Sequence, residues 1–475
     1  MTTLIASTNP SDDYALLWTV ESSSPEEIHV KLAIARDVQK SWKTLSVEDR
    51  AHTLRALYHH FIHEKENIAE SIAAEMGMPI RLAREEVLTG LAYFLWYLDN
   101  AEKYLAPEIT FEDKNQLHMV HYEAKWIVAA ITPWNYPFML FIWACIQPLL
   151  AGNSVVWKIS KEVILTGKLI AAVIANSSLP LWVWTEVYGD GSVGDILTDG
   201  DIDMITFTGS TAVGEKLANK AHARGISVVM ELGGSAPGII LPDADIDSVL
   251  ETIYFMRYSN SWQMCDGLKR LIVHSSRYDE VVEKLSAKVL SKKIGNASDE
   301  SVDIWPLVSE KQKEIAEKQL TDALGWGAII LAENMADKSL KWAYFPLLLL
   351  GGVTREMQVW NEEVFAPILP IVTYETLEEA IALANDTPYG LGAYVFTENR
   401  ELFLMIAARI ESGMVQMNHV NYCIPADPFG GYKASGIGRE HGRWGFHEFV
   451  NVKVLSMPKI WDNKQDEGIV KSIHG

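Results

Sequence analysis

The chain has 475 residues, 48% of them apolar, which is enough for two or three globular domains with large cores. Its 41 lysines and arginines against 62 aspartates and glutamates give a formal net charge of −21, which would repel nucleic acid and anionic membranes. Three scattered cysteines form neither a disulfide framework nor a thiolate metal site, so we expect no metal and a reducing compartment. The sequence begins without a signal-peptide pattern and contains no apolar run that could span a bilayer, which predicts a cytoplasmic protein without membrane partners.

The spacing of apolar residues changes along the chain. The first hundred residues predict three helices, over 25–43, 47–76 and 79–105. From Trp126 onward, short apolar runs alternate with helical segments, as is typical of a parallel sheet buried on both faces. A second alternating set begins near Asp245. The pattern therefore predicts an α/β fold with two doubly wound parallel-sheet domains.

Two strand-like segments fall outside these alternating sets. Residues 109–123 have the pattern of a hairpin, and residues 450–457 that of a further strand. Exposed strand edges readily pair with another chain. We therefore expect a homo-oligomer, a dimer or a tetramer, that associates through these pieces.

The segment YSNSWQMCDGLKR contains a cysteine in polar surroundings. Free cysteine is usually a small buried packing residue. Around Cys265, however, lie Asn260, Ser261, Gln263 and Asp266, which are poor core residues. The pattern favours a reactive thiol.

Two strand ends are candidate ligand sites. Glu231 ends the apolar run ISVVMEL, at the edge where open α/β sheets place ligands, although a solvated strand end is the alternative. The segment FTGSTAVG, residues 207–214, opens a helix whose free N–H groups suit a phosphate, or it is an ordinary helix cap. Residues 189–194 fit G-x-G-x-x-G but lack an acidic residue about 20 positions on, so a tight turn is favoured there.

A loop and a strand end carry further polar candidates. Asn135 lies between Pro133 and Pro137, and a rigid loop of this kind suits an amide that stabilises an oxyanion. A proline-rich turn with aromatic packing is the alternative. Lys158 and Lys161 follow a predicted strand and are either ordinary exposed lysines or nucleotide contacts.

Seven segments in order resemble the NAD(P)-dependent aldehyde dehydrogenase superfamily over nearly the whole chain: PWNYP, WKIS, FTGST, ELGGSAP, SWQMCDG, EEVFAPI and PFGGYKASGIGRE. The separation of Glu231 from Cys265 is similar to that family's spacing of base and nucleophile. The stretches ELGGSAPGIIL and GIGREHGRWGFHEFVNV look most like the bacterial succinate-semialdehyde dehydrogenase branch.

The resemblance implies catalytic roles. Cys265 would attack the aldehyde as a thiolate, and the Asn135 amide with the Cys265 backbone N–H would hold the oxyanion. Glu231 would activate the water that hydrolyses the thioester, which argues against a CoA-acylating enzyme. Glu440 would belong to a proton relay.

The resemblance also implies a cofactor, NADP or NAD. Its binding residues would be Lys158, Lys161, Trp134, Gly209, Ser210, Glu363 and Phe365. Many relatives that use NAD have a glutamate where this chain has Lys161. Because lysine can pair with a 2′-phosphate, we expect NADP to be accepted.

The substrate would be a small aldehyde in a pocket formed by Tyr136, Trp143, Trp262 and Phe429. Trp143 stands where relatives that act on succinic semialdehyde often carry an arginine. An uncharged aromatic or aliphatic aldehyde is therefore the alternative, unless His419 or Asn421 replaces the arginine. Trp262 stands where relatives usually have glycine; it would be strained by about 1–2 kcal/mol if φ is positive there, and we expect it to restrict the pocket.

A non-catalytic nucleotide-binding scaffold is the alternative from another class, and retention of the catalytic set argues against it. The resemblance implies an aldehyde dehydrogenase-like division of the chain: a cofactor-binding, Rossmann-like domain (1–105 and 125–233), a catalytic domain (234–434), an oligomerisation β element (106–124 and 450–460), a return segment to the cofactor domain (435–449) and a tail (461–475).

Overall fold

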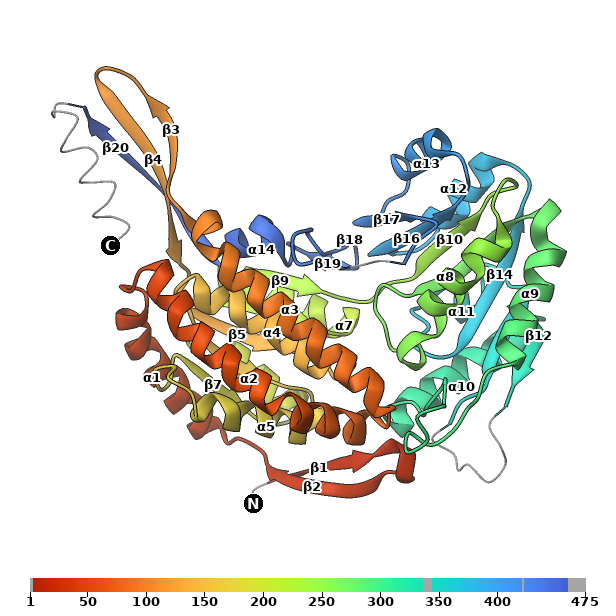
Figure 1. Cartoon of the computed structure of the whole chain (residues 1–475), viewed down its shortest axis with the longest axis horizontal. Helices are drawn as coiled ribbons and strands as arrows, with labels where there is room; N and C mark the ends of the chain where they lie inside the picture. Colours follow the sequence, from red (N-terminus) through yellow and green to blue (C-terminus); the bar gives the residue numbers. More distant parts are fainter. Residues whose placement is uncertain (1–2, 336–343, 421–422, 460–475) are drawn as a thin grey trace.

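A computed structural model describes residues 3–335, 344–420 and 423–459, together with the backbone but not the side chain of Trp262. The predicted tail, 461–475, lies outside the described residues. Two mainly parallel sheets, each covered by helices, form the body, and a small antiparallel sheet projects from it (Figure 1). The predicted α/β fold with two doubly wound sheets is confirmed.

The chain begins with a hairpin of β1 (Leu4–Asn9) and β2 (Ala15–Glu21), which the sequence pattern did not predict. Leu16 and Trp18 are exposed on β2, so the strand lacks the alternation of a half-buried strand. The hairpin lies along one edge of the molecule (Figure 1).

The three predicted helices are confirmed as α1 (Pro25–Trp42), α2 (Val47–Met76) and α3 (Ile80–Leu105). The Ser46 hydroxyl caps the start of α2 by accepting from the backbone N–H of Asp49. Gly77 ends α2 with φ of 61°, a conformation that glycine adopts without steric cost.

The first large sheet has six strands in the order β19-β9-β8-β5-β6-β7, all parallel except β19. The buried side chains of α1, α6 and α7 cover one face, and those of α2 to α5 cover the other. The strands are β5 (Ile127–Ile131), β6 (Ser154–Lys158), β7 (Trp184–Val187), β8 (Met204–Thr208), β9 (Ser227–Glu231) and β19 (Gly436–Ile437). The helices are α4 (Pro137–Leu150), α5 (Ile164–Ala175), α6 (Gly191–Asp199) and α7 (Thr211–Ala223).

The second large sheet has seven strands in the order β12-β13-β14-β11-β10-β16-β17, parallel except where β12 meets β13. Helices α8 and α9 cover one face, and α10 to α13 the other. The strands are β10 (Ala236–Ile240), β11 (Leu268–His274), β12 (Ile329–Asn334), β13 (Leu347–Gly351), β14 (Ile368–Tyr374), β16 (Gly392–Phe396) and β17 (Met414–Met417). The helices are α8 (Ile246–Tyr258), α9 (Tyr278–Leu290), α10 (Glu310–Gly325), α11 (Gln358–Asn361), α12 (Leu377–Asn385) and α13 (Arg400–Ala407). This set begins at β10, earlier than the expected start near Asp245.

The projecting sheet consists of β3 (Glu108–Glu112), β4 (Gln116–Ala124) and β20 (Val450–Pro458) (Figure 1). The order is β20-β4-β3 and all pairs are antiparallel, so the predicted hairpin and late strand are confirmed and lie side by side. Val452 and Val454 on β20 are exposed.

After the second sheet, the chain returns to the first. The two-residue strand β18 (Tyr432–Lys433) pairs with β15 (Tyr389–Gly390), and Gly436 on β19 then pairs with Glu231 on β9. Helix α14 (Gly442–Glu448) follows and packs on α3. Within the described ranges, none of the helices has the length and apolar character needed to cross a bilayer.

Candidate active site

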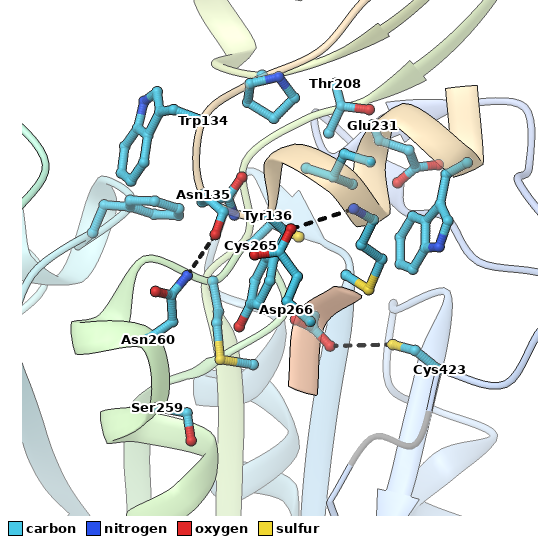
Figure 2. Close-up of a pocket in the computed structure, with 18 of the residues that line it drawn as sticks. Trp134, Asn135, Tyr136, Thr208, Glu231, Ser259, Asn260, Cys265, Asp266 and Cys423 are labelled. Carbon is cyan, nitrogen blue, oxygen red and sulfur yellow. Dashed lines mark hydrogen bonds between the residues drawn. The ribbon is translucent and has the colours of Figure 1, made fainter. Parts of the chain in front are cut away.

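A cavity of about 440 Å³ is lined by residues from strands β8 and β9 of the first large sheet and by loops and helices that connect or cover the strands of the second. Asn135, Glu231 and Cys265, which are far apart in the sequence, line this cavity (Figure 2). The structure therefore brings the three predicted catalytic residues together.

Cys265 follows a tight turn, the 3₁₀ segment Ser259–Trp262, at the end of α8. Asn260 and Ser261 have left-handed backbones, with φ of 51° and 47°, which costs roughly 1–2 kcal/mol per residue without glycine. The Asn260 amide donates to the Asn135 carbonyl at 2.8 Å, and the Ser261 hydroxyl donates to the Trp305 carbonyl at 2.9 Å. These buried bonds hold the turn. The expectation that Trp262 restricts the pocket concerns a side chain outside the described part of the structure.

The Asn135 side chain is buried, and its amide donates to the backbone carbonyl of Gln263 at 2.8 Å. An amide nitrogen carries two N–H groups, and this bond uses one of them while fixing the plane of the amide. Asn135 is thus tied to the peptide chain two residues before the thiol.

Cys265 is partly buried at the wall of the cavity. Burial raises its pKa well above the usual value, the negative charge of Asp266 raises the pKa further, and the positive charge of Lys269 opposes both. The Lys269 ammonium donates to the Cys265 carbonyl at 3.2 Å. A Cβ at Gly234 would lie 2.4 Å from that carbonyl oxygen, so glycine is required beside the thiol loop.

Glu231 and Glu440 are two buried carboxyls on the wall of the same cavity. Neither oxygen of Glu231 has a hydrogen-bond partner among the described residues. Burial raises the pKa of Glu231 well above its usual value, and the neighbouring charge of Glu440 raises it further. Burial raises the pKa of Glu440 to about 8. The two neighbouring carboxyls therefore both have raised pKa values, as is common for groups in functional sites.

Five of the predicted cofactor residues line this cavity: Trp134, Gly209, Ser210, Glu363 and Phe365. Ser210 precedes α7, but its side chain does not cap the helix, so the helix N-terminus remains a site for a pyrophosphate. The Glu363 carboxylate accepts from Lys269 and from the Gly234 backbone N–H, which fixes it at the cavity wall. The donor set and the helix terminus fit a nicotinamide dinucleotide.

Lys158 and Lys161 do not line the cavity and lie at the carboxyl end of β6. Lys158 is buried, and burial lowers its pKa to about 8. Lys161 is 55% exposed and pairs with Glu162 at 3.5 Å. Lys161 is thus accessible to a ligand anion from solvent.

The predicted substrate residues Tyr136, Trp143 and Phe429 line the cavity. The rings of Trp143 and Phe429 lie 5.3 Å apart, and His441 meets the Trp143 ring edge-on at 4.2 Å. This wall is aromatic, as expected.

Glu86 is a cavity residue that the sequence interpretation missed. One carboxylate oxygen accepts from the backbone N–H groups of Phe138 and Met139, at 2.9 and 3.3 Å, and so caps α4. The other oxygen is buried without a partner among the described residues. Burial raises the pKa of Glu86 to about 8. The sequence feature that could have identified Glu86 is its place on the apolar stripe of α3, beside Ala83 and Val87, where a carboxylate is unexpected.

Asp266 and Cys423 also belong to the cavity wall. The Cys423 thiol donates to the Asp266 carboxylate at 3.7 Å (Figure 2). The Tyr394 hydroxyl donates to the Asp266 carbonyl at 2.9 Å and holds its backbone. The sequence interpretation used Asp266 only as evidence that Cys265 lies in polar surroundings.

Comparison with known proteins shows which family has this sequence and architecture. The model of the aldehyde dehydrogenase family matches residues 2–455. A mitochondrial succinate-semialdehyde dehydrogenase of Oryza sativa is 32% identical over 95% of this chain and 86% of its own. A chloroplastic betaine aldehyde dehydrogenase of Amaranthus hypochondriacus is 33% identical over 94% of this chain and 91% of its own. The NAD+ complex of an aldehyde dehydrogenase from Bacillus cereus superposes with a TM-score of 0.92 at 28% identity, covering 96% of this chain and 93% of that one.

The two sheets, the cavity between them and these similarities define an NAD(P)-dependent oxidoreductase that acts on aldehydes. The chain belongs to the aldehyde dehydrogenase family.

Proposed function

We propose that the chain oxidises an aldehyde to its carboxylic acid with Cys265 as the nucleophile. The observation that carries this proposal is the convergence of Cys265, Asn135 and Glu231 on one cavity, beside the open N-terminus of α7. The first large sheet would bind the cofactor, and the second would supply the thiol.

In the first half-reaction, the Cys265 thiolate forms a bond to the carbonyl carbon, and the carbonyl oxygen becomes an oxyanion. The second N–H of the Asn135 amide and the Cys265 backbone N–H donate to that oxygen. A nicotinamide held beside Cys265 would supply the acceptor for the hydride that leaves the same carbon. Loss of this hydride leaves a thioester on Cys265.

In the second half-reaction, a water adds to the thioester carbon as Glu231 takes its proton. The carbon–sulfur bond breaks, and Cys265 leaves as the thiolate. Glu440 accepts the proton from Glu231 and passes it toward solvent. The pKa of Glu440, raised to about 8 by burial, suits a group that gains and loses a proton near neutrality.

The test is an aldehyde panel with each cofactor, followed by absorbance of the reduced nicotinamide. We expect turnover in the wild type and none in C265A. Failure of every aldehyde in the panel, with identical traces from C265A, would favour the nucleotide-binding scaffold.

We propose that NADP is accepted as well as NAD. Lys161 supports this proposal, because its exposed ammonium can pair with a 2′-phosphate. Its ion pair with Glu162, at 3.5 Å, is exposed to solvent and therefore weak.

For the substrate, we propose an aldehyde without an anionic group. Among the described residues that line the cavity, none is lysine, arginine or histidine, which leaves a substrate carboxylate without a partner there. The aromatic wall of Tyr136, Trp143 and Phe429 supports the same choice over succinic semialdehyde.

We propose further that the chain forms a cytoplasmic homo-oligomer through the projecting sheet. β20 and β3 are the edges of that sheet, and Val452 and Val454 expose apolar side chains there. Edge strands with apolar faces are suited to pairing with a second copy. The three cysteines are free, in keeping with a reducing compartment.

A further inference from the structure

The cavity has an unusual balance of charge. The part of its wall that the structure describes carries six carboxyl side chains and no basic side chain: Glu85, Glu86, Glu231, Asp266, Glu363 and Glu440. The proposed reaction uses Glu231 and Glu440, and Glu363 is held by Lys269 at the cofactor end. Glu86 and Asp266 have no part in those steps.

Glu86 presents an unsatisfied oxygen at the cavity. Its residue is only 6% exposed, and the oxygen that does not cap α4 has no partner among the described residues. Leaving a buried acceptor unpaired is destabilising, and more so for a charged group. A ligand with N–H groups or a positive charge would remove that cost.

Asp266 lies beside the nucleophile. Its backbone is fixed by the Tyr394 hydroxyl and its carboxylate accepts from the Cys423 thiol, so the side chain has a defined position next to Cys265. A negative charge there opposes formation of the Cys265 thiolate. This unfavourable effect is offset when a substrate brings a positive charge to the same place.

Aromatic side chains on the cavity wall add a second attraction for a cation. Tyr136, Trp143, Trp305 and Phe429 all line the cavity. Aromatic faces attract a cation, most strongly when it is desolvated. Carboxylates and rings together favour a cation over a neutral group and exclude an anion.

We propose that the cavity selects aldehydes that carry a cationic nitrogen a few bonds from the carbonyl, with Asp266 as the charged partner of that nitrogen and Glu86 as a buried carboxyl that ionises when the nitrogen binds. This inference rests on the proposed aldehyde oxidation. The nitrogen must lie within a few bonds of the carbonyl because its partner, Asp266, is next to the nucleophile, Cys265, in the chain.

The first test compares two aldehydes of the same shape. Betaine aldehyde carries a trimethylammonium group, and 3,3-dimethylbutanal has a carbon atom in place of that nitrogen. We expect kcat/KM to be at least about tenfold higher for betaine aldehyde, a difference of about 1.4 kcal/mol. Equal efficiencies, or a preference for the neutral aldehyde, would overturn the proposal.

Two variants test whether Asp266 and Glu86 cause the preference for the cationic aldehyde. D266N and E86Q should each lower the ratio of the two efficiencies by about tenfold. E86Q retains an oxygen that can cap α4, which protects the fold. E102Q removes a carboxylate from an exposed position on α3 and should leave the ratio unchanged. Equal ratios in wild type and D266N would contradict the assignment of Asp266.

A binding measurement separates this inference from the proposed function. Choline and 3,3-dimethylbutan-1-ol are the matching alcohols, and calorimetric titration of each requires no turnover. Tighter binding of choline, weakened in D266N, supports the cation site even if D266N or the wild type oxidises neither aldehyde. Equal binding of the two alcohols overturns the cation site, whereas absence of oxidation with every aldehyde overturns the proposed function alone.

Discussion

Asn135, on the cavity wall, and Gln263 are joined by a 2.8 Å hydrogen bond between residues 128 positions apart in the sequence. The bond links the loop before α4, in the first half of the chain, to the turn that presents Cys265. A single contact therefore fixes the position of the Asn135 amide relative to the loop that carries the Cys265 thiol.

Replacing Asn135 tests its role as an oxyanion donor. We expect N135A to lower kcat by about 10²- to 10³-fold, the usual effect of removing one such donor. The measurement is steady-state reduction of the nicotinamide.

N260A is the matched control for that change. Asn260 also donates to the Gln263 carbonyl, at 3.3 Å, and to the Asn135 carbonyl, but it has no proposed contact with the oxyanion. We expect a lower Tm, from a loss of about 1–3 kcal/mol, and a smaller loss of kcat than in N135A. An equal loss of kcat in both variants would show that Asn135 acts only by ordering the turn.

Glu440 should control the pH dependence of hydrolysis. Its negative charge raises the pKa of Glu231, so E440Q should lower that pKa. A base with a lower pKa stays deprotonated at lower pH, and the acid limb of the rate profile should move toward acid. The profile is measured with the hydrolysis step isolated by rapid mixing.

D427N is the control for E440Q, because it removes an exposed carboxylate from the loop that precedes the return segment. Its profile should match that of the wild type. A profile in E440Q that is unchanged or displaced toward higher pH would show that the charge of Glu440 does not raise the pKa of Glu231.

The convergence of Asn135, Glu231 and Cys265 on one cavity was predictable from sequence because each lies in a short motif at a loop or strand end. The place of Glu86 at the cavity was not, because it depends on how α3 packs against the start of α4, 52 residues away at Phe138. The β1–β2 hairpin was missed for a different reason. Its exposed residues, such as Trp18, do not alternate, so only tertiary contacts define these strands.

Lys161 should set the preference for the 2′-phosphate. We expect K161E to lower kcat/KM for NADP by about 10- to 100-fold, since a charge-assisted hydrogen bond contributes roughly 1.5–3 kcal/mol, and to change the value for NAD less. K65E, the same change at an exposed lysine on α2, should affect neither cofactor. A parallel fall for both cofactors in K161E would contradict the proposed contact.

The projecting sheet should hold the oligomer together. Val454 is 62% exposed on β20, and V454D would place a charge in the proposed interface. We expect analytical ultracentrifugation to show a smaller assembly in V454D than in the wild type. L181D changes a leucine that is 74% exposed elsewhere on the surface and should leave the assembly intact. A monomeric wild type, or an unchanged assembly in V454D, would refute this interface.

The covalent role of Cys265 is tested most directly by mass spectrometry of E231Q after reaction with an aldehyde and oxidised cofactor. Without its base, the thioester should hydrolyse slowly and accumulate. The account predicts one acyl group per chain, on the peptide that contains Cys265, and one equivalent of reduced nicotinamide. Reduction at the wild-type rate without this adduct, or an adduct on Cys145 or Cys423 instead, would contradict it.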